Sequence, residues 1–566
     1  MTTRRDLLKG LGFGVAALGL PSGCVTVAQR ASGRNPNVVL IYSDDQGWGD
    51  VGYHGYTDVL TPNIDRLAAE GTQFSQGYVS ASVCGPSRCG LLTGVYQQRL
   101  GVYGNYDKGG IPTSQPTLFE MLKREGYTCG VVGKWHVGMA REELRPNARG
   151  ADFFYGFLGG SHDYYTSSRD PDDRRRGERP IMRNGQVERP IQESKGYLTE
   201  MFTQEAVQFI ERTDDEPFCL YLAYNAVHHP WSVPDSYVKR VQHLATHDER
   251  KLFAGMVLAL DDGVGAVMAA LRKKGVADDT LVIFMSDNGS PRGQGIAAPR
   301  QKTRGTTTMS SPGPFNGFKG DTYEGGTRVP FVMRWPGWIP KGKTYRQPVI
   351  NLDIPATVLA RCGVSKPWQG HVFDGVDLLP FVVGPKPSAA QPHEVLYWRR
   401  GEDYAILAGD WKLARNDQAG PRTIRLFNLA ADPGEWKDLA QAHPERAQAM
   451  QDLFDAWDSA LPDNQSGRNP RNRNTGFVAG KRVDVAEFNR TVAAAPAPRG
   501  KAANPNVRTL ETELARDKRT ATQKGRPFNP EQTKRWFRAK DLNGDGILDE
   551  RELRTKVRPD WNKVGK

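Results

Sequence analysis

The sequence predicts an α/β protein with a large, mostly parallel sheet sandwiched by helices, followed by a small antiparallel sheet. Four short apolar runs have the composition of strands buried on both faces, and helical stretches separate them. The apolar runs occupy residues 37–43, 128–132, 218–223 and 281–286. The helical stretches include residues 62–70, 117–125 and 251–273. This alternation favours a mostly parallel sheet that is covered on both faces.

From about residue 391 the pattern changes to short strand-like pieces without helices between them. These pieces occupy residues 395–399, 404–408, 411–414 and 425–428, and a helical stretch follows at residues 445–461. We therefore expect a small antiparallel sheet with one helix packed against it.

The length of 566 residues exceeds what one hydrophobic core usually serves, so we expect several folded parts. The predicted parts are a signal segment at 1–35, the large α/β domain at 36–385, a small α+β subdomain at 386–465, a basic irregular linker at 466–530 and a helix-loop-helix at 531–566. We expect no apolar run long enough to span a membrane.

The net charge of +12 is concentrated in one part of the chain. Residues 466–566 hold 24 Lys and Arg against 12 Asp and Glu, so the residues before them carry no net charge. No recognised nucleic-acid fold accompanies this basic tail, and we expect no nucleic-acid partner. An anionic polysaccharide would be attracted by the same field.

The N-terminus predicts export. Residues 3–9 resemble a twin-arginine signal, and a mildly apolar, glycine-rich segment follows at residues 11–20. The alternative is a disordered basic terminus. Export predicts a periplasmic, outer-membrane-anchored or extracellular location in a bacterium. The stretch from Leu20 to Cys24 loosely resembles a lipoprotein cleavage box with its Leu one place too far away, so a lipid anchor at Cys24 stays open.

Acidic and amide side chains occupy two positions at which predicted strands end, and ligands usually bind at the carboxyl ends of parallel strands. Asp44 and Asp45 follow the first apolar run, and Asp287 and Asn288 follow the last. A lone Asp-Asp pair is more often a solvated turn, because adjacent carboxylates repel unless a cation separates them. Three carboxylates and an amide together suit a hard cation such as Ca²⁺ or Mg²⁺, and no cluster of His and Cys favours zinc.

Basic and imidazole groups follow the other two runs. Lys134 and His136 come after the second run, His228 comes after the third, and Lys319 lies further along the chain. A lone Lys or His at such a position is usually a surface or structural residue. Complementary groups at four strand ends instead favour a functional site.

Cys84 begins the pentapeptide Cys-Gly-Pro-Ser-Arg, which ends at Arg88. Alone, it could be a loop before a helix, because Pro86 suits a first helical turn. Together with the groups at the strand ends, it resembles the maturation motif of the type I sulfatases. The segments that match this family in order are Asp44-Asp45, Cys84-x-Pro86-x-Arg88, Gly133 to His136, His228-x-Pro230, Asp287 to Gly289, Lys319 and Glu324 to Pro330. The match extends over about residues 37–380, and Asp432 to Glu435 also resembles the family's C-terminal subdomain.

The resemblance implies an alkaline-phosphatase-like fold and an exported sulfatase that hydrolyses sulfate esters, most simply those of sulfated carbohydrates. Cys84 would be oxidised by a formylglycine-forming maturation enzyme, and the hydrated aldehyde at that position would be the nucleophile. One Ca²⁺ would be held by Asp44, Asp45, Cys84 in its oxidised form, Asp287 and Asn288.

The resemblance also implies roles for the basic groups. Arg88, Lys134 and Lys319 would balance the charge on the transferring sulfuryl group. His228, with Lys319, would protonate or stabilise the leaving oxygen, and His136 would take the proton from the second hydroxyl so that sulfate is expelled.

Two other functions stay open. A phosphate or phosphonate monoester hydrolase of the same superfamily could use a similar clamp of charges, and substrate preference would separate it from a sulfatase. A non-catalytic, calcium-dependent glycan-binding protein would keep Cys84 as a thiol. A binding protein, however, has no need of His136, His228 and Lys319 together.

The sequence departs from the family pattern near the motif. Val95 follows Leu-Thr-Gly where the family often has Arg, and Cys89 occupies a position where a small residue is usual. A Ser or His that contacts sulfate in relatives would correspond to Ser161 or His162.

A second metal site is predicted near the C-terminus. The loop from residue 541 to residue 552 resembles an EF-hand, with a glycine for the turn at its sixth position. The residues expected to hold this second Ca²⁺ are Asp541, Asn543, Asp545, Ile547 and Glu552. Because no second loop of this kind is found, we expect a structural or anchoring ion rather than a regulatory sensor.

Overall fold

The computed structural model describes most of residues 35–462 and two short strands beyond them. The stretches inside 35–462 that it leaves undescribed are 106–108, 172, 174–178, 245–247, 293–308, 365–367, 369–370, 384–390 and 417–422. The chain divides into two compact units, residues 1–492 and 493–566. The described residues of the second unit form strands β17 (Arg508–Thr509) and β18 (Ile547–Leu548), which pair antiparallel.

Several predicted features lie outside the described residues. These are most of the signal segment with Cys24, and the EF-hand residues Asp541, Asn543, Asp545 and Glu552. Ile547 belongs to β18, where it lies opposite Thr509. The signal segment and the EF-hand therefore stay predictions.

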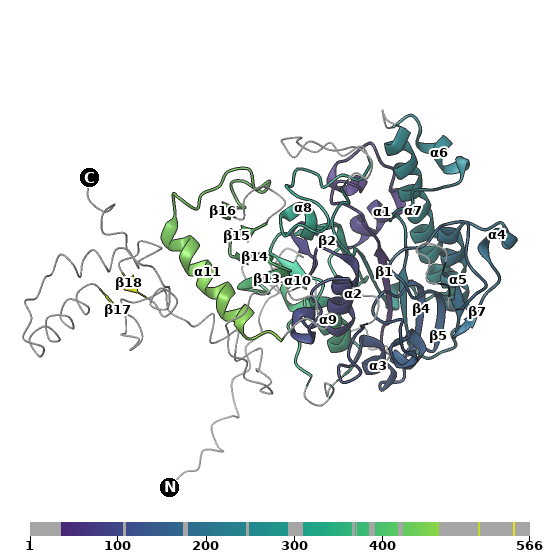
Figure 1. Cartoon of the computed structure of the whole chain (residues 1–566). Helices are drawn as coiled ribbons and strands as arrows, with labels where there is room; N and C mark the ends of the chain where they lie inside the picture. The colour runs from purple at the N-terminus through teal and green to yellow at the C-terminus, as the bar shows by residue number, and fades with distance from the viewer. Residues whose placement is uncertain are drawn as a thin grey trace, which may run out of the picture. The chain divides into compact units, whose positions relative to one another are not determined.

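A ten-stranded sheet forms the centre of the first unit (Figure 1). Its strand order is β11-β2-β10-β9-β1-β8-β4-β5-β6-β7. The five neighbouring strands that run parallel are β9 (Thr280–Ser286), β1 (Asn37–Ser43), β8 (Phe218–Ala223), β4 (Thr128–Lys134) and β5 (Phe153–Phe157). The four strands predicted from the apolar runs are all among these five, so that prediction is confirmed.

The edges make the whole sheet mixed. Strand β10 (Phe331–Arg334) runs antiparallel to both β9 and β2 (Thr72–Phe74). The remaining edge strands are β11 (Lys343–Tyr345), β6 (Met182–Arg183) and β7 (Gln186–Val187). A separate two-stranded sheet joins β3 (Gly77–Tyr78) and β12 (Val349–Ile350). Strands of two to four residues carry too little pattern to be predicted, and these short strands were not among the expected elements.

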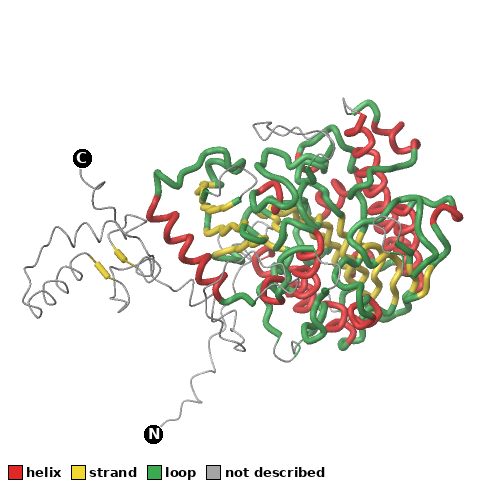
Figure 2. The backbone as a smooth tube through the Cα atoms, in the orientation of Figure 1, coloured by secondary structure: helices red, strands yellow, loops and turns green. Residues whose placement is uncertain are grey.

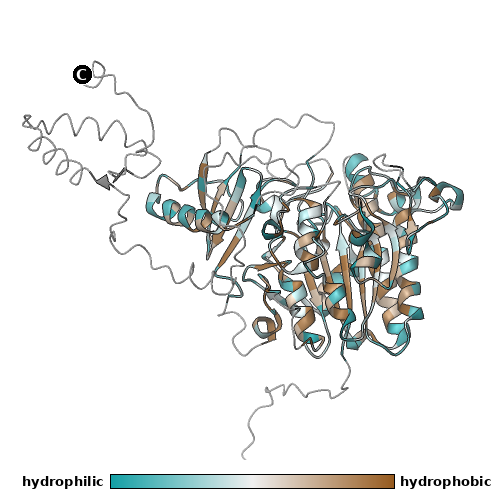
Figure 3. Ribbon diagram, turned by 60° about the horizontal axis from the view of Figure 1, so that its bottom comes forward, coloured by the Kyte–Doolittle hydropathy of each residue, from teal (hydrophilic) through white to brown (hydrophobic). Residues whose placement is uncertain are grey.

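Helices cover both faces of the large sheet (Figure 2). One layer holds α1 (Pro62–Glu70), α5 (Leu198–Arg212), α6 (Asp235–Val241) and α7 (Asp248–Lys274). The other layer holds α2 (Cys84–Thr93), α3 (Leu118–Lys123) and α9 (Asp353–Arg361). Because side chains alternate along a strand, Val39 and Ile41 of β1 pack in the first layer while Val38 and Leu40 pack in the second. Figure 3 shows apolar helix faces turned toward the sheet.

Short helical segments connect these elements. They are α4 (Ile191–Ser194), α8 (Glu324–Thr327), α10 (Leu379–Val383) and the single 3₁₀ turns Gly52–His54, Gln97–Leu100, Glu142–Leu144, Pro146–Arg149 and Ala277–Asp279.

Helix α7 differs from the expectation that no apolar run could span a membrane. The helix has 27 residues and contains a stretch with a mean hydropathy of 1.6, so by length and composition alone it could cross a membrane. In the structure 72% of that stretch is buried inside the protein. The apolar composition of α7 is explained by its place in the core, where it packs against α1, α5 and α6.

The small antiparallel sheet is confirmed. It is formed by β13 (Val395–Arg400), β14 (Asp403–Ala408), β15 (Trp411–Arg415) and β16 (Ile424–Asn428), in sequence order. Helix α11 (Pro444–Ser459) packs on this sheet, with Phe454 stacked on Tyr404 at 4.1 Å and Trp457 on Tyr397 at 4.8 Å between ring centres. We call β13 to β16 together with α11 the small sheet unit.

The N-terminus of α1 is capped from a distant helix. Asp261 of α7 accepts hydrogen bonds from the backbone N–H groups of Asn63 at 3.0 Å and Ile64 at 2.8 Å. Asp261 is buried, and the first N–H groups of a helix have no partner within that helix. This carboxylate therefore joins two helices of one layer.

We expect Asp261→Ala to lower the free energy of unfolding by about 2 kcal/mol, because it leaves N–H donors of α1 without an acceptor. Urea unfolding followed by circular dichroism measures this loss. The control is Asp262→Ala, which removes the partly exposed pair with Arg240 and should cost about 0.5 kcal/mol. Equal losses in the two variants would show that Asp261 has no special capping role.

Candidate active site

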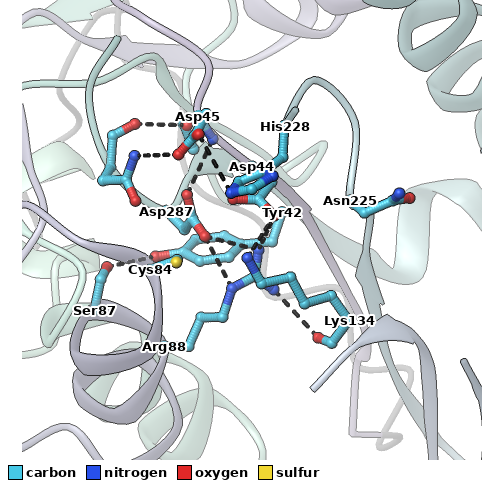
Figure 4. A network of polar contacts seen from close by, with 12 residues as sticks. Tyr42, Asp44, Asp45, Cys84, Ser87, Arg88, Lys134, Asn225, His228 and Asp287 are labelled. Atoms are coloured by element: carbon cyan, nitrogen blue, oxygen red, sulfur yellow. Dashed lines mark hydrogen bonds and ion pairs between the residues drawn. The ribbon is translucent and has the colours of Figure 1, made fainter. Parts of the chain in front are cut away.

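The carboxyl ends of the central strands bring the predicted acidic residues together. Ser43 of β1 lies opposite Ser286 of β9, so Asp44 and Asp287 leave the sheet side by side. The backbone of Asp45 is left-handed, with φ of 62°, and its N–H donates to Asp287 Oδ1 at 3.2 Å. Figure 4 shows the three carboxylates around one space.

Asn288 adds an amide to this acidic group. Its Nδ2 donates to Asp45 Oδ1 at 2.8 Å. Asn288 Oδ1 and Asp44 Oδ1 are buried and have no hydrogen-bond partner among the described residues. Buried oxygen atoms normally have a partner, and oxygen atoms beside carboxylates are the ligands that a hard cation prefers. The residues present therefore fit a divalent cation such as Ca²⁺.

Helix α2 presents the motif to this space. It begins at Cys84, and Arg88 lies four residues later on the same face. The Sγ atom of Cys84 and one carboxylate oxygen each of Asp44 and Asp287 all lie within 4.8 Å of one another. Position 84 therefore lies at the start of a helix and beside the acidic group.

Three cations each make their shortest ion pair with a different one of the three carboxylates. The pairs are Arg88 with Asp287 at 2.8 Å, Lys134 with Asp44 at 2.5 Å, and Lys319 with Asp45. The side chains of Arg88 and Lys134 are fully buried, whereas that of Lys319 is 18% exposed. When all six groups are ionised they carry no net charge, so a bound divalent cation would leave the site with two positive charges and suited to an anion.

The pKa values of the carboxylates follow from this pairing. Burial opposes ionisation of Asp45, but Lys319 and His228 outweigh it and lower the pKa of Asp45. For Asp44, burial and the neighbouring Asp287 raise the pKa well above its usual value. A buried carboxyl group whose ionisation is opposed in this way is one that a cation would stabilise.

Two histidines face the same space. His228 Nε2 lies 3.6 Å from Asp45 Oδ2. His136 has a left-handed backbone, with φ of 59°, and a buried Nδ1 without a hydrogen-bond partner among the described residues. Burial lowers the pKa of His228 to about 4, and burial together with Lys134 lowers the pKa of His136 well below its usual value. Both rings are therefore neutral at neutral pH and can accept a proton.

Glycine is required before Lys134. Gly133 has φ of 110°, and a Cβ there would lie 2.0 Å from the carbonyl oxygen of Ala223 on β8. A side chain would push β4 away from β8 and displace the ammonium group that pairs with Asp44.

Two neighbours of the motif are not among the residues predicted from the sequence. Asn105 Oδ1 accepts from Gly85 N–H at 3.0 Å, and its Nδ2 lies 3.7 Å from Cys84 Sγ. The hydroxyl of Tyr221 accepts from Arg88 Nη1 at 3.2 Å. Asn105 lies in a loop and belongs to no recognised motif. Tyr221 lies within a predicted strand, where only the alternation of side chains could have placed it on the α2 side.

The unusual residues near the motif have structural places. Cys89 is buried in the core, and burial raises its pKa to about 12. Both ring nitrogens of His162 lie 2.6 Å from backbone carbonyl oxygens, those of Asp163 and Arg179. The ring of His162 is therefore engaged by its own loop, while Ser161 is partly exposed.

Comparison with known protein families agrees with the functional site that this geometry indicates. The sequence profile named Sulfatase matches residues 36–364. The chain belongs to the sulfatase family. Sulfatases are sulfuric ester hydrolases, so the protein is an enzyme of that class. A second profile, described as N-sulphoglucosamine sulphohydrolase, C-terminal, matches residues 318–458 of this sulfatase.

Relatives are similar over most of their length. The N-acetylgalactosamine-6-sulfatase of Mus musculus is 35% identical in an alignment 398 residues long, which covers 67% of this chain and 71% of that protein. The N-acetylgalactosamine-6-O-sulfatase of Bacteroides thetaiotaomicron is 28% identical in an alignment 509 residues long, which covers 78% of this chain and 97% of that protein. The solved structure of Ps i-CgsB in complex with k-i-k-neocarrahexaose is 31% identical, with a TM-score of 0.67, and covers 82% of this chain and 98% of that one. The expected alkaline-phosphatase-like α/β fold is thus confirmed.

We expect Arg88→Met to lower the free energy of unfolding by about 3 kcal/mol, because it leaves the buried Asp287 without its cation. The measurement is urea unfolding of the metal-free protein. Arg169→Met serves as the control, because Arg169 pairs with Glu193 at the exposed surface and should contribute much less to stability. A loss at Arg88 no larger than at Arg169 would be incompatible with a paired buried charge.

Proposed function

We propose that this sulfatase hydrolyses sulfate esters of carbohydrates, using a formylglycine formed from Cys84 and one Ca²⁺. The observation that carries the proposal is the position of Cys84 at the start of α2, beside Asp44 and Asp287 and among three cations. The names of the relatives support a carbohydrate substrate, since they are N-acetylgalactosamine-6-sulfatases, and one solved structure contains neocarrahexaose.

Asp44, Asp45, Asp287 and Asn288 would hold the Ca²⁺ together with an oxygen at position 84. When bound, the ion would polarise a sulfate oxygen and favour ionisation of a hydroxyl at position 84. The chain's own residues act in the same direction. Burial opposes ionisation of the Cys84 thiol, yet the neighbouring lysines outweigh burial and lower its pKa. An anion at this position is therefore already stabilised by the protein.

The charges also suit a sulfate ester. With a divalent cation, the paired groups would carry two positive charges. These would balance one ionised hydroxyl at position 84 and the single negative charge of a sulfate monoester. Lys134 and Arg88, which are fully buried, lie where the sulfuryl group would be enclosed.

The exposed side of the site indicates where the alcohol leaves. His228 and Lys319 are each 18% exposed, so the leaving oxygen would be placed toward them. A bound sulfate anion raises the pKa of His228 from its low value, so that the ring can hold a proton and deliver it. His136 lies deeper, and its unpartnered Nδ1 would accept the proton from the hydroxyl at position 84.

The protein would be exported, and its C-terminal parts would bind a second Ca²⁺ and attract the substrate. The twin-arginine pattern and the apolar segment after it support export, with or without a lipid anchor at Cys24. The loop motif supports a second Ca²⁺ near the C-terminus, and the basic segment 466–530 would attract a polyanionic substrate. A formylglycine-forming enzyme would be the maturation partner.

We expect the peptide that contains position 84 to be about 18 Da lighter than the cysteine form when the protein is made in a host with a formylglycine-forming enzyme. Cys84→Ala should abolish sulfate release, because it removes the nucleophile. Cys89→Ala is the control and should keep both the mass loss and the activity. Full activity in a protein whose Cys84 is an unmodified thiol would contradict the proposed nucleophile.

We expect chelation with EGTA to abolish sulfate release and added Ca²⁺ to restore it. Asn288→Ala should raise the Ca²⁺ concentration needed for half-maximal activity on the order of tenfold, because one ligand is lost. Glu552→Gln, in the predicted EF-hand, should leave this concentration unchanged. A shift with Glu552→Gln and none with Asn288→Ala would place the essential ion outside the active site.

A further inference from the structure

The small sheet unit contacts the loop that carries Lys319. We define the Lys319 loop as residues 316–323. On one side, Lys319 N–H donates to the carbonyl oxygen of Ser290 at 2.7 Å. On the other side, the carbonyl oxygen of Gly320 accepts from Nη1 of Arg400 at 2.8 Å. Arg400 is the last residue of β13, so this loop lies between the active site and the small sheet unit.

The first turn of α8 supports the Lys319 loop and the turn after β9 together. Gly325 N–H donates to Asn316 O at 2.7 Å, and Gly289 N–H donates to Gly326 O at 3.1 Å. A Cβ on Gly325 would lie 2.2 Å from Gly317 O, and a Cβ on Gly289 would lie 2.0 Å from Gly325 O. Because no side chain fits between Gly325 and Gly317, a displacement of α8 would displace the Lys319 loop.

Lys412 of the small sheet unit and Glu435, in the connection between β16 and α11, fix α8 in place. Glu435 Oε2 accepts from the backbone N–H of Glu324, the first residue of α8, at 2.7 Å. Lys412 of β15 places its Nζ 2.8 Å from Glu324 Oε1 and 3.0 Å from Glu435 Oε1. All three side chains are fully buried. Glu435 O also accepts from Nδ2 of Asn316 in the Lys319 loop, at 3.4 Å.

This buried network is an inefficient way to gain stability. Apolar side chains of similar volume often stabilise a core as well as a buried ion pair does. Burial opposes the charge of Glu435 and raises its pKa, so the pair with Lys412 has to offset this cost. The contacts that join these three residues do not include the acidic group at the strand ends. What the network does provide is a fixed geometry for α8.

We propose that the small sheet unit, through Glu435, Lys412 and Arg400, is a positioning device for Lys319. It holds α8 and the Lys319 loop so that the ammonium group lies beside the leaving oxygen of the ester. The inference rests on the proposed role of Lys319 in catalysis. It assigns a role to the Asp-Pro-Gly-Glu segment that ends at Glu435. The proposed chemistry at the strand ends does not involve this segment.

Two substrates with different leaving groups can distinguish a positioning role of the small sheet unit from a general structural role. A sugar alcohol is a poor leaving group and depends on stabilisation of its oxygen, whereas 4-nitrophenolate leaves with little help. A displaced Lys319 should therefore slow hydrolysis of a sugar sulfate more than hydrolysis of 4-nitrophenyl sulfate. A less stable protein would instead lose both activities in proportion to the folded fraction.

The main variant is Glu435→Gln, which keeps the shape of the side chain. Its amide nitrogen must face either the N–H of Glu324 or the ammonium group of Lys412, so one of these two donors loses its contact with this side chain. We expect kcat for N-acetylgalactosamine 6-sulfate to fall about tenfold, and kcat for 4-nitrophenyl sulfate to fall less than about threefold. The control is Phe454→Leu, which opens a cavity in α11 of the same unit and should change neither kcat in the folded protein.

A double-mutant cycle with Lys319→Ala gives the decisive result. If Glu435 acts through Lys319, Glu435→Gln should lower kcat for the sugar sulfate about tenfold in the wild type and by less than about twofold in Lys319→Ala. The same fold loss in both backgrounds would overturn the proposal while leaving the function intact. An unchanged kcat in Lys319→Ala alone would instead refute the proposed role of Lys319, and with it this inference.

Arg400→Met keeps the proposal testable if Glu435→Gln fails to fold. This variant releases Gly320 from the opposite side, and Arg400 is partly exposed. We expect Arg400→Met to lower kcat more for the sugar sulfate than for 4-nitrophenyl sulfate. In the Lys319→Ala background, Arg400→Met should cause no further loss of kcat. Equal losses on both substrates, or an unchanged effect without Lys319, would overturn the proposal.

Discussion

Three buried carboxylates, each paired with one cation, are the interaction on which the active site depends. Without Arg88, Lys134 and Lys319, the carboxylates at the ends of β1 and β9 would repel one another in a region closed to water. The pairing also sets the charge of the site. Because the six groups cancel, the charge available to a substrate would be that of the bound metal ion, which is what an enzyme for anionic esters needs.

The rest of the fold serves to bring these six groups together from distant parts of the sequence. Parallel strands β1 and β9 deliver two carboxylates in register, and β4 delivers Lys134 from the other side of β8. Helix α2 adds Arg88 beside Cys84. Lys319 comes from a loop rather than a strand, so it needs support of another kind. The contacts of α8 with the small sheet unit supply a physical reason for a second, smaller sheet in this enzyme.

Much of the site could be predicted because the central strands are buried on both faces. Such strands are almost wholly apolar, so the polar residues that end them, including Asp44 and Asp287, stand out in the sequence. The order of the motifs then carried the family resemblance. Short edge strands were not predictable, because two or three residues have no readable period. Helix α7 shows the reverse problem, since its apolar composition alone does not distinguish a core helix from one that crosses a membrane.

Lys412 and Glu435 show what a sequence cannot convey. Lys412 lies in an ordinary-looking strand, and a lysine there would normally be assigned to the surface. Only the fold brings it between two glutamates from other segments. The central claim is that this arrangement of charges hydrolyses carbohydrate sulfate esters. The most direct test is kcat/KM of the Ca²⁺-loaded, formylglycine-bearing protein for N-acetylgalactosamine 6-sulfate and for the matching 6-phosphate. We expect sulfate to be released much faster than phosphate; faster release of phosphate would contradict the claim and make the protein a phosphate ester hydrolase.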